Sequence, residues 1–211
     1  QLPGSFMWQL YRMVLGKDEI PPKSLLDKAP LTWRLMRLLP ELINQPHFEP
    51  LQRFLTDDSD LRKRYQLAER LADLFDQYQV YRADWLEDWA AGRHQLRNGR
   101  GESKPLDPAN CWQAELWRAL LLDVGEAGMA QSRAGVHQRF IERINSLEQA
   151  PPGLPSRVIV FGISSLPAQA LEALAGLARF SQVLLCVHNP CRHHWSDIVA
   201  DKDLLRNEYK R

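Results

Sequence analysis

The segment from Leu55 to Leu86 carries polar side chains whose types and spacing suit contact with nucleic-acid bases. Five of them recur every three or four residues and would share one face of a helix: Arg62, Gln66, Glu69, Asp73 and Asp76. Carboxylates and amides can accept hydrogen bonds from base edges, as Asp and Glu do from cytosine N4. A groove that only holds phosphate would instead be basic. The face is therefore a candidate for reading bases.

The same spacing also fits two plainer interpretations. Asp73 can pair within the helix with Arg70 or with Gln77, as charged residues on solvated helix faces often do. An acidic face of this kind can equally dock against a partner protein. The residue pattern by itself leaves these alternatives open.

No group of residues in the sequence predicts catalysis. The sequence lacks a G-x-x-x-x-G-K-[ST] phosphate loop, an H-E-x-x-H motif and a G-x-S-x-G motif. Potential metal ligands gather near one end: Cys186, His188, Cys191, His193 and His194. Their spacing is not that of a known zinc site, and we interpret them as a strand end followed by surface histidines. The DDSD run at 57–60 lacks the pattern of a calcium loop and is read as a helix cap. We expect no metal and no cofactor bound by this chain.

Aromatic and basic residues offer weaker signals for nucleic acid. Four of the seven tryptophans fall on apolar helical faces, where packing is the expected role and stacking on an unpaired base is the alternative: Trp33, Trp85, Trp89 and Trp117. The segment 92–110 is polar and rich in Gly and Pro, which predicts an exposed, mobile loop. Its cations are expected to be solvated, with phosphate contact as the alternative: Arg93, Arg97, Arg100 and Lys104.

Composition limits the class of protein. The chain has 211 residues, 27 Lys and Arg against 26 Asp and Glu, and 45% hydrophobic residues, so any contact with a polyanion must be local. Its apolar runs are too short for a membrane span, and no signal peptide opens it. Three cysteines form no disulfide framework, which fits the cytoplasm. The start in mid-pattern at Gln1 suggests a piece of a longer protein.

Apolar periodicity predicts helices over most of the first 150 residues. We expect one after Ser5 that ends at Gly16, one over 31–44 despite Pro40, a short one over 47–55, and a long one over 59–79 capped by Asp58 or Ser59. Further helices are expected after Asp84 as a cap, over 111–124 and over 132–148.

The pattern then changes to that of a parallel sheet. Two short apolar runs, Arg157 to Phe161 and Gln182 to Val187, flank a predicted helix from Pro167 to about Ala178. Such a β-α-β unit has parallel strands and a right-handed crossover. The fold class expected is therefore α/β, mostly helical overall, with an α/β domain interrupted by a large all-α insertion.

Several segments carry a family resemblance: LTDDSDLRKRYQLAERLADLFDQYQVYRADWL, PPGLPSRVIVFGISSLP and HNPCRHHWSDI, with TWRLMRLLPEL and VHQRFIERI in support. Across nearly all 211 residues the chain resembles the RecC family, the gamma chains of exodeoxyribonuclease V. Two features depart from the family pattern: the segment 92–110 is longer, and HHW near residue 193 differs.

The resemblance implies an inactive, superfamily 1 helicase-like domain with a parallel sheet. Residues 1–30 would be a lead-in helix and loop, 31–150 a helical 1B-like insertion, and 151–211 the βαβ return to the 1A-like domain. It also implies a non-catalytic subunit that works with RecB-like and RecD-like partners on single-stranded DNA and duplex ends. ATP and Mg would belong to those partners, and no membrane is involved.

In the family this subunit scans a strand for the Chi sequence during recombinational repair of double-strand breaks. The resemblance places the Chi-reading positions at Asp73, Leu74, Asp76, Gln77, Arg82 and Arg133. The alternative is a structural scaffold that docks the RecB-like subunit without touching bases.

Overall fold

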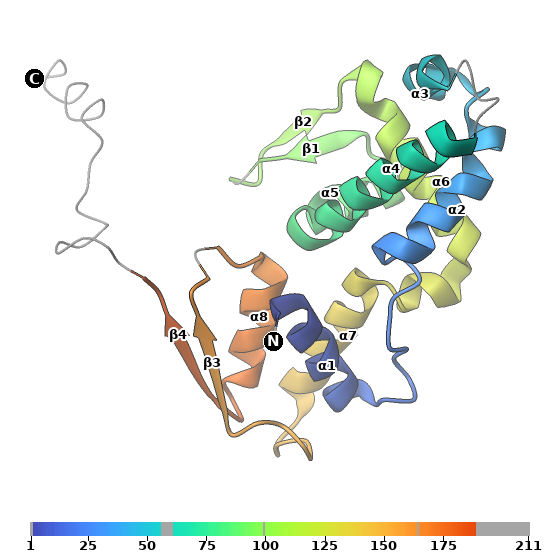
Figure 1. The fold of residues 1–211 in the computed structure, drawn as a ribbon. Coiled ribbons are helices and arrows are strands. Elements are labelled where there is room, and N and C mark those ends of the chain that lie inside the picture. Colours follow the sequence, from blue (N-terminus) through green and yellow to red (C-terminus); the bar gives the residue numbers. More distant parts are fainter. Residues whose placement is uncertain (1, 56–60, 99, 164, 189–211) are drawn as a thin grey trace, which may run out of the picture.

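The computed structural model describes residues 2–55, 61–98, 100–163 and 165–188 (Figure 1). The helices are α1 (Pro3–Leu15), α2 (Lys28–Leu42), α3 (Glu49–Phe54), α4 (Leu61–Tyr81), α5 (Ala83–Ala90), α6 (Cys111–Ala130), α7 (Arg133–Ser146) and α8 (Ala168–Leu177), with short 3-10 turns at Pro46–Phe48 and Pro108–Asn110. The strands are β1 (Gln95–Arg97), β2 (Ser103–Pro105), β3 (Arg157–Phe161) and β4 (Gln182–Cys186). None of the helices in these ranges is both long and apolar enough to cross a membrane.

The helices α2 to α6 surround one hydrophobic core. The apolar faces of α2 and α4 meet through Leu31, Leu35 and Ala72, and α5 and α6 add the fully buried Trp89 and Leu120. Pro40 lies inside α2 without ending it before Leu42. The long helix α4 thus has one buried side, which fixes its rotation about its own axis and leaves the opposite side toward solvent.

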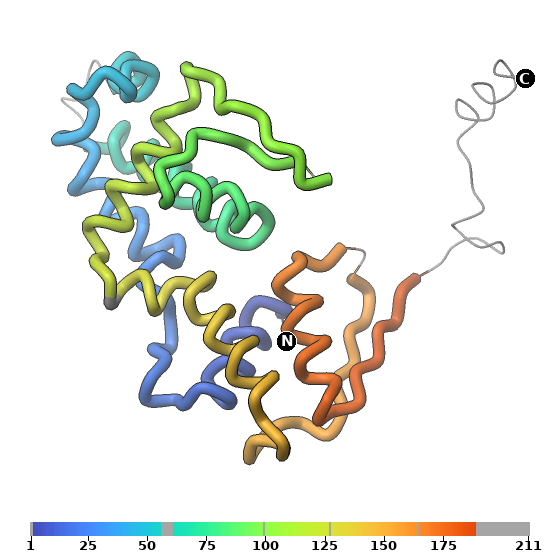
Figure 2. Tube along the Cα trace, turned by 180° about the vertical axis from the view of Figure 1, so that it is seen from behind, coloured from blue at the N-terminus to red at the C-terminus, as the bar shows by residue number. Residues whose placement is uncertain are grey.

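A second core joins parts of the chain that are far apart in sequence. Residues of α1 and α7 pack together and against α8, as Figure 2 shows from behind. Leu10, Phe140 and Leu177 are fully or almost fully buried there. Next to them Tyr11 Oη lies 2.8 Å from Nδ1 of His137. The other ring nitrogen of this histidine, Nε2, lies 2.9 Å from Glu172 Oε2. This polar chain ties the three helices to one another.

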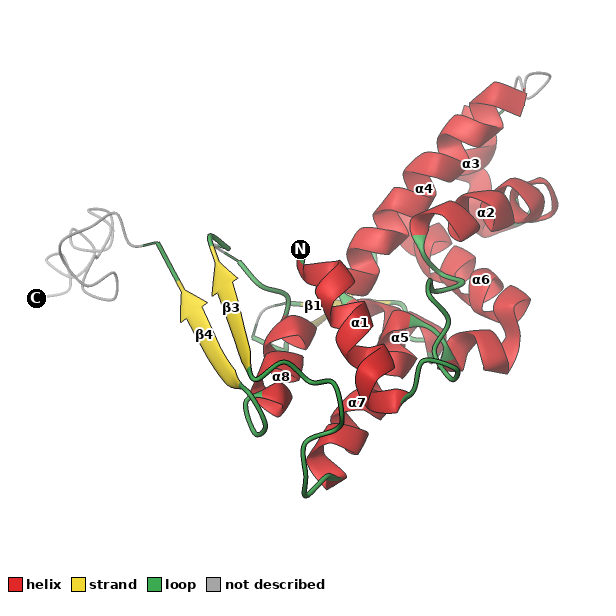
Figure 3. Ribbon diagram, turned by 60° about the horizontal axis from the view of Figure 1, so that its bottom comes forward, coloured by secondary structure: helices red, strands yellow, loops and turns green. Residues whose placement is uncertain are grey.

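The predicted βαβ unit is confirmed. Strand β3 pairs in parallel with β4 over five residue pairs, from Arg157 with Gln182 to Phe161 with Cys186, and α8 makes the crossover (Figure 3). Val158 and Val183 face the second core, whereas Ile159 and Phe161 are exposed by 59% and 79%. The two-stranded sheet is therefore covered on one face and open on the other.

The segment 92–110 is not the structureless loop that its composition predicts. It forms an antiparallel hairpin in which β1 pairs with β2 from Gln95 with Pro105 to Arg97 with Ser103. The base of the hairpin is held by Asp88 of α5, whose fully buried carboxylate accepts hydrogen bonds from Arg93, Gln95 and Arg97. The prediction missed this anchor because it lies outside the segment.

Three other details differ from expectation. Asp84 lies inside α5 rather than capping it, because Arg82 occupies the cap position. Trp33 is 65% exposed, so its predicted role in packing is wrong, while Trp89 and Trp117 are buried as expected. Helix α6 continues to Ala130 past a break at Gly125, whose φ of 67° suits glycine. The predicted caps Asp58 and Ser59 lie outside the described residues.

The two cores divide the chain between α6 and α7, inside the range predicted for the insertion, residues 31–150. The first core begins at Leu26 and includes Val124 of α6. Helix α7 belongs to the second core, together with α1 and α8. The division at 31 and 150 stays a prediction, and the packing adds that α7 adheres to the βαβ side.

Candidate nucleic-acid interface

The rotation of α4 decides which side chains are presented. Ala68, Leu71, Ala72 and Phe75 are buried against α2 and α6, and the amide of Gln79 donates a 2.8 Å hydrogen bond to the Leu26 carbonyl. The buried set recurs every three or four residues, so Glu69, Asp73 and Gln77 fall on the other side. The polar base-reading candidates of α4 therefore lie along one accessible edge.

Asp73 is held by two neighbours. Lys28 Nζ of α2 donates to Asp73 Oδ1 at 2.9 Å, and Gln77 Nε2 donates to Asp73 Oδ2 at 3.1 Å. The hydrogen bond from Lys28, followed by the charge of that ammonium, holds the pKa of Asp73 below its usual value. The side chain remains 45% exposed. Asp73 is thus an ionised acceptor in reach of solvent, as base reading requires.

Asp76 sits in a tighter environment with Arg133. The Arg133 guanidinium places Nη2 2.9 Å from Asp76 Oδ1, in a geometry that makes an ion pair rather than an aligned hydrogen bond. The same group donates to Asp27 Oδ1 through Nε at 3.1 Å and Nη2 at 2.9 Å. Burial raises the pKa of Asp76, an effect that the Arg133 charge opposes. The Arg133 guanidinium thus pairs with two carboxylates, that of Asp76 on α4 and that of Asp27, the residue before α2.

The two remaining predicted residues are placed differently. Leu74 is half-buried on α4. Arg82 stacks over Trp85, with its guanidinium carbon 3.8 Å from the ring centroid, and donates two hydrogen bonds to Asp84 at 3.1 and 2.9 Å. It also donates to the Arg97 carbonyl of the hairpin. Arg82 therefore engages α5 and the hairpin.

The structure brings together four of the six predicted positions: Asp73, Asp76, Gln77 and Arg133. We call these four the reader face. Lys28 pairs with Asp73 of this face and Asp27 pairs with Arg133, but neither residue was predicted from the sequence. Asp27 could have been suspected because it immediately precedes a helix, whereas nothing in the sequence signals that Lys28 reaches Asp73.

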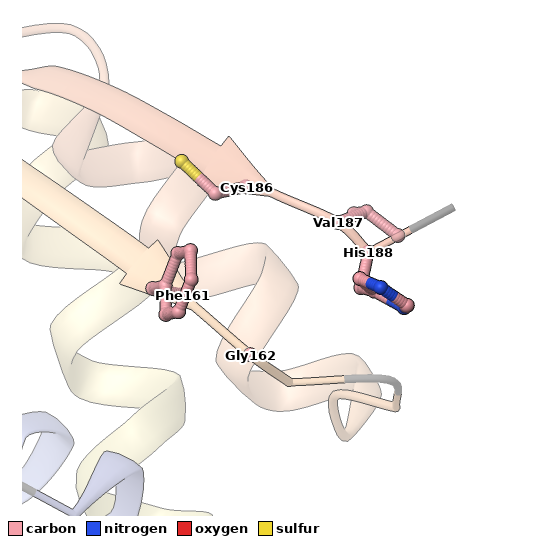
Figure 4. A pocket seen from close by; sticks show the side chains of 5 residues that line it. All are labelled: Phe161, Gly162, Cys186, Val187 and His188. Carbon is pink, nitrogen blue, oxygen red and sulfur yellow. The ribbon is translucent and has the colours of Figure 1, made fainter. Parts of the chain in front are cut away.

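A shallow pocket of about 450 Å³ lies at the carboxyl ends of β3 and β4 (Figure 4). Phe161, Gly162, Cys186, Val187 and His188 line it. Ligands of open α/β sheets bind at this end of the strands. These five lining residues include no carboxylate for a divalent cation and no lysine for phosphate.

The described ranges offer no cluster of metal ligands. They contain no group of three or more His, Cys, Asp or Glu side chains that could hold an ion. Cys191, His193 and His194 of the discounted ligand cluster lie outside those ranges.

The described chain is a mixed α/β protein, in which a helical core is joined to a parallel βαβ unit and presents a charged helix face. A family model described as RecC, N-terminal domain, matches residues 1–211. The chain is 46% identical over 198 residues, or 93% of its length, to RecBCD enzyme subunit RecC of Escherichia coli K12. It is 36% identical over its whole length to RecBCD enzyme subunit RecC of Haemophilus influenzae.

These two alignments cover 17% and 19% of the relatives, so the chain spans less than a fifth of the length of the curated proteins that it matches. A relative from Mycolicibacterium smegmatis, with the same printed name, is 28% identical over 83% of this chain. The chain belongs to the RecC N-terminal domain family. The family resemblance noted in the sequence is thereby confirmed.

Proposed function

We propose that this chain is a DNA-binding, Chi-scanning part of a RecC-type subunit and has no catalytic site of its own. Its relatives are named as subunits of the RecBCD enzyme, which supports RecB-like and RecD-like partners for this chain as well. ATP and Mg would be bound by those partners. The observation that carries the proposal is the reader face, where α7 brings Arg133 beside the acidic edge of α4.

We propose that the βαβ unit belongs to a helicase-like 1A domain and that residues 31–150 form its 1B-like insertion. The parallel pair β3 and β4 with its crossover helix α8 is the building unit of such sheets. The open face around Ile159 and Phe161 is typical of parallel sheets that are covered by a further layer. The pocket at the strand ends has a lining that suits an inactive nucleotide site.

The reader face has the chemistry for base contacts. Asp73 can accept from an exocyclic amine such as cytosine N4, and Gln77 can donate and accept. Arg133 and Arg82 suit guanine O6 and N7 or phosphate, and Leu74 offers an apolar surface to a base. Lys28 leaves much of the Asp73 carboxylate exposed, so a base amine can bind without first displacing the lysine.

The scaffold alternative is supported by the same contacts. Asp73 is paired with Lys28, Asp76 with Arg133 and Arg82 with Asp84. Residues that are satisfied inside the chain can hold helices in place for a RecB-like partner without touching DNA. A variant that separates the two roles is therefore needed.

The test uses the complete protein assembled with its partner subunits. Asp73→Ala should abolish the response to Chi while DNA unwinding persists, because the substitution removes an acceptor but no buried group. Asp18→Ala, which removes an exposed carboxylate after α1, is the control and should respond normally. A normal Chi response in Asp73→Ala and Arg82→Ala would refute base reading. Loss of the RecB-like subunit from purified Asp73→Arg complexes would support the scaffold.

A further inference from the structure

We infer that Trp33 and Tyr65 form a stacking site for an unpaired base of single-stranded DNA, beside the reader face. The inference rests on the proposed function only in taking single-stranded DNA as the ligand. None of the positions carried over by the family resemblance belongs to this pair. It is separate from the Asp73 and Arg133 contacts, so the two can be tested independently.

The first observation is the exposure of the two rings. Trp33 of α2 is 65% exposed and Tyr65 of α4 is 40% exposed, with ring centroids 6.0 Å apart and planes tilted by 53°. Because the rings are not parallel, neither one covers the full face of the other. Leu61, one turn before Tyr65, is 62% exposed and extends the patch. Aromatic side chains of this size are usually largely buried, so an exposed pair indicates a binding surface.

The second observation is how charge is distributed along α4. Its first ten residues, 61–70, contain Arg62, Lys63, Arg64 and Arg70 against Glu69, and three aspartates at 57, 58 and 60 precede them in the sequence. Its remaining residues, 71–81, contain Asp73 and Asp76 and no cation. Tyr65 lies in the half that carries the cations, and Asp73, Asp76 and Gln77 lie in the other half. Within α4 the cations are therefore confined to the first half.

Two cations lie one helical turn from the rings in sequence. Arg62 lies one turn before Tyr65 on α4. Arg37 lies one turn after Trp33 on α2, where it pairs with Asp123 and keeps 60% of its side chain exposed. Glu69 lies one turn after Tyr65, and its charge contributes to the raised pKa of Lys28, which places it near an opposing cation. Aromatic faces beside Arg and Lys are the arrangement that holds single-stranded nucleic acid, in which bases stack and phosphates meet cations. An apolar protein partner would not need the cations.

The third observation is continuity with the reader face. Tyr65, Glu69, Asp73 and Asp76 are spaced by four, four and three residues, so they follow one edge of α4. Asp73 lies eight residues beyond Tyr65, or about 12 Å along the helix axis. A strand that stacks one base on Trp33 can thus present later bases to Asp73 and Gln77. The stacking site would hold the strand while the reader face distinguishes its bases.

The experiment is photocrosslinking of the complete protein with single-stranded oligonucleotides that carry one 5-iodouracil. Crosslinked peptides are identified by mass spectrometry, which locates the contact whatever the overall affinity. We expect adducts at Trp33 or Tyr65, and a roughly tenfold or greater loss of them in Trp33→Ala. Trp33→Phe keeps an aromatic face and should retain most of the adduct. Leu122→Ala, at an 84% exposed apolar residue of α6, should change nothing.

The outcomes separate the inference from its alternatives. Absence of adducts at both rings would overturn it. Release of a partner subunit by Trp33→Ala, with unchanged crosslinking elsewhere, would identify a protein interface and also overturn it. A thermal unfolding midpoint shared by Trp33→Ala and Trp33→Phe excludes misfolding as the cause of a loss. If Asp73→Ala responds normally to Chi while the Trp33 adducts persist, base reading fails and the stacking site stands.

Discussion

Arg133 Nη2 lies 2.9 Å from Asp76 Oδ1, and this contact joins the start of α7 to the middle of α4. Because the same guanidinium also donates to Asp27 at 2.9 and 3.1 Å, it links three segments across the boundary of the two hydrophobic cores. The residues proposed to read DNA are therefore also residues that hold the two halves of the chain together.

Replacing Arg133 should weaken this joint. In Arg133→Ala, the half-buried carboxylates of Asp76 and Asp27 lose their shared cation. We expect the free energy of unfolding to fall by roughly 1–3 kcal/mol, the usual cost of leaving a partly buried charge unpaired. Urea denaturation measures it, with the exposed Arg143→Ala on the same helix as control. Equal stability of the two variants would mean that the ion pairs contribute nothing.

Asp76→Asn, unlike Arg133→Ala, should not lower the free energy of unfolding. Burial raises the pKa of Asp76, so the folded state favours its neutral form and ionised Asp76 destabilises the fold above that pKa. At pH 7 the amide should leave stability unchanged or raise it by up to about 1 kcal/mol. The difference from the parent should shrink to zero below about pH 4, where both states are protonated. Urea denaturation at pH 7 and pH 3.5 tests this, and a variant less stable at pH 7 would contradict it.

The hairpin should open as pH falls. Hydrogen bonds from Arg97, Gln95 and Arg93 hold the pKa of Asp88 well below its usual value, although burial opposes them. A lowered folded pKa contributes stability above the unfolded pKa, near 4, which is lost as pH falls toward the folded value.

Asp88→Asn should reproduce this loss at pH 7. We expect the exchange of the Leu106 amide hydrogen, which donates to the His94 carbonyl, to accelerate roughly tenfold or more. Glu87→Gln, an exposed neighbour, serves as the control. Unchanged exchange in Asp88→Asn would show that the hairpin is held by other contacts.

The ionisation of Asp73 should depend on Lys28. The hydrogen bond from Lys28 is the main cause of the lowered pKa of Asp73, so Lys28→Met should raise this pKa toward its ordinary value. An NMR titration of the Asp73 carboxyl carbon measures the change. Lys23→Met, at an exposed position before α2, should leave the pKa of Asp73 unchanged. A pKa of Asp73 that is insensitive to Lys28 would show that the pair does not persist in solution.

Local patterns predicted much of the fold. Strand β3 was predicted with its observed ends, since a short apolar run bounded by Pro and Gly indicates a strand. Trp33 was misplaced because α2 is apolar on most sides, so periodicity cannot tell which side faces solvent. The hairpin was missed because its stability comes from Asp88, a residue outside the segment. Gly- and Pro-rich composition alone cannot reveal such an anchor.

The candidate site was predicted in part. The edge of α4 with Asp73 and Asp76 follows from helical spacing, and the family resemblance added Arg133. Neither source predicted that Arg133 would pair with Asp76 or Lys28 with Asp73, because those contacts depend on how α7 and α2 pack against α4. Long-range pairs of this kind are set by the packing of the two cores.

If the α4 edge reads bases, its residues should determine which base is preferred at particular positions. The most direct measurement compares Asp73→Asn with the parent, in the assembled complex, on a panel of Chi octamers with single base changes. An amide replaces one acceptor oxygen by a donor, so the order of preference should change at one or two positions while unwinding continues. A response that keeps the parent's order of preference at every position would contradict base reading by α4.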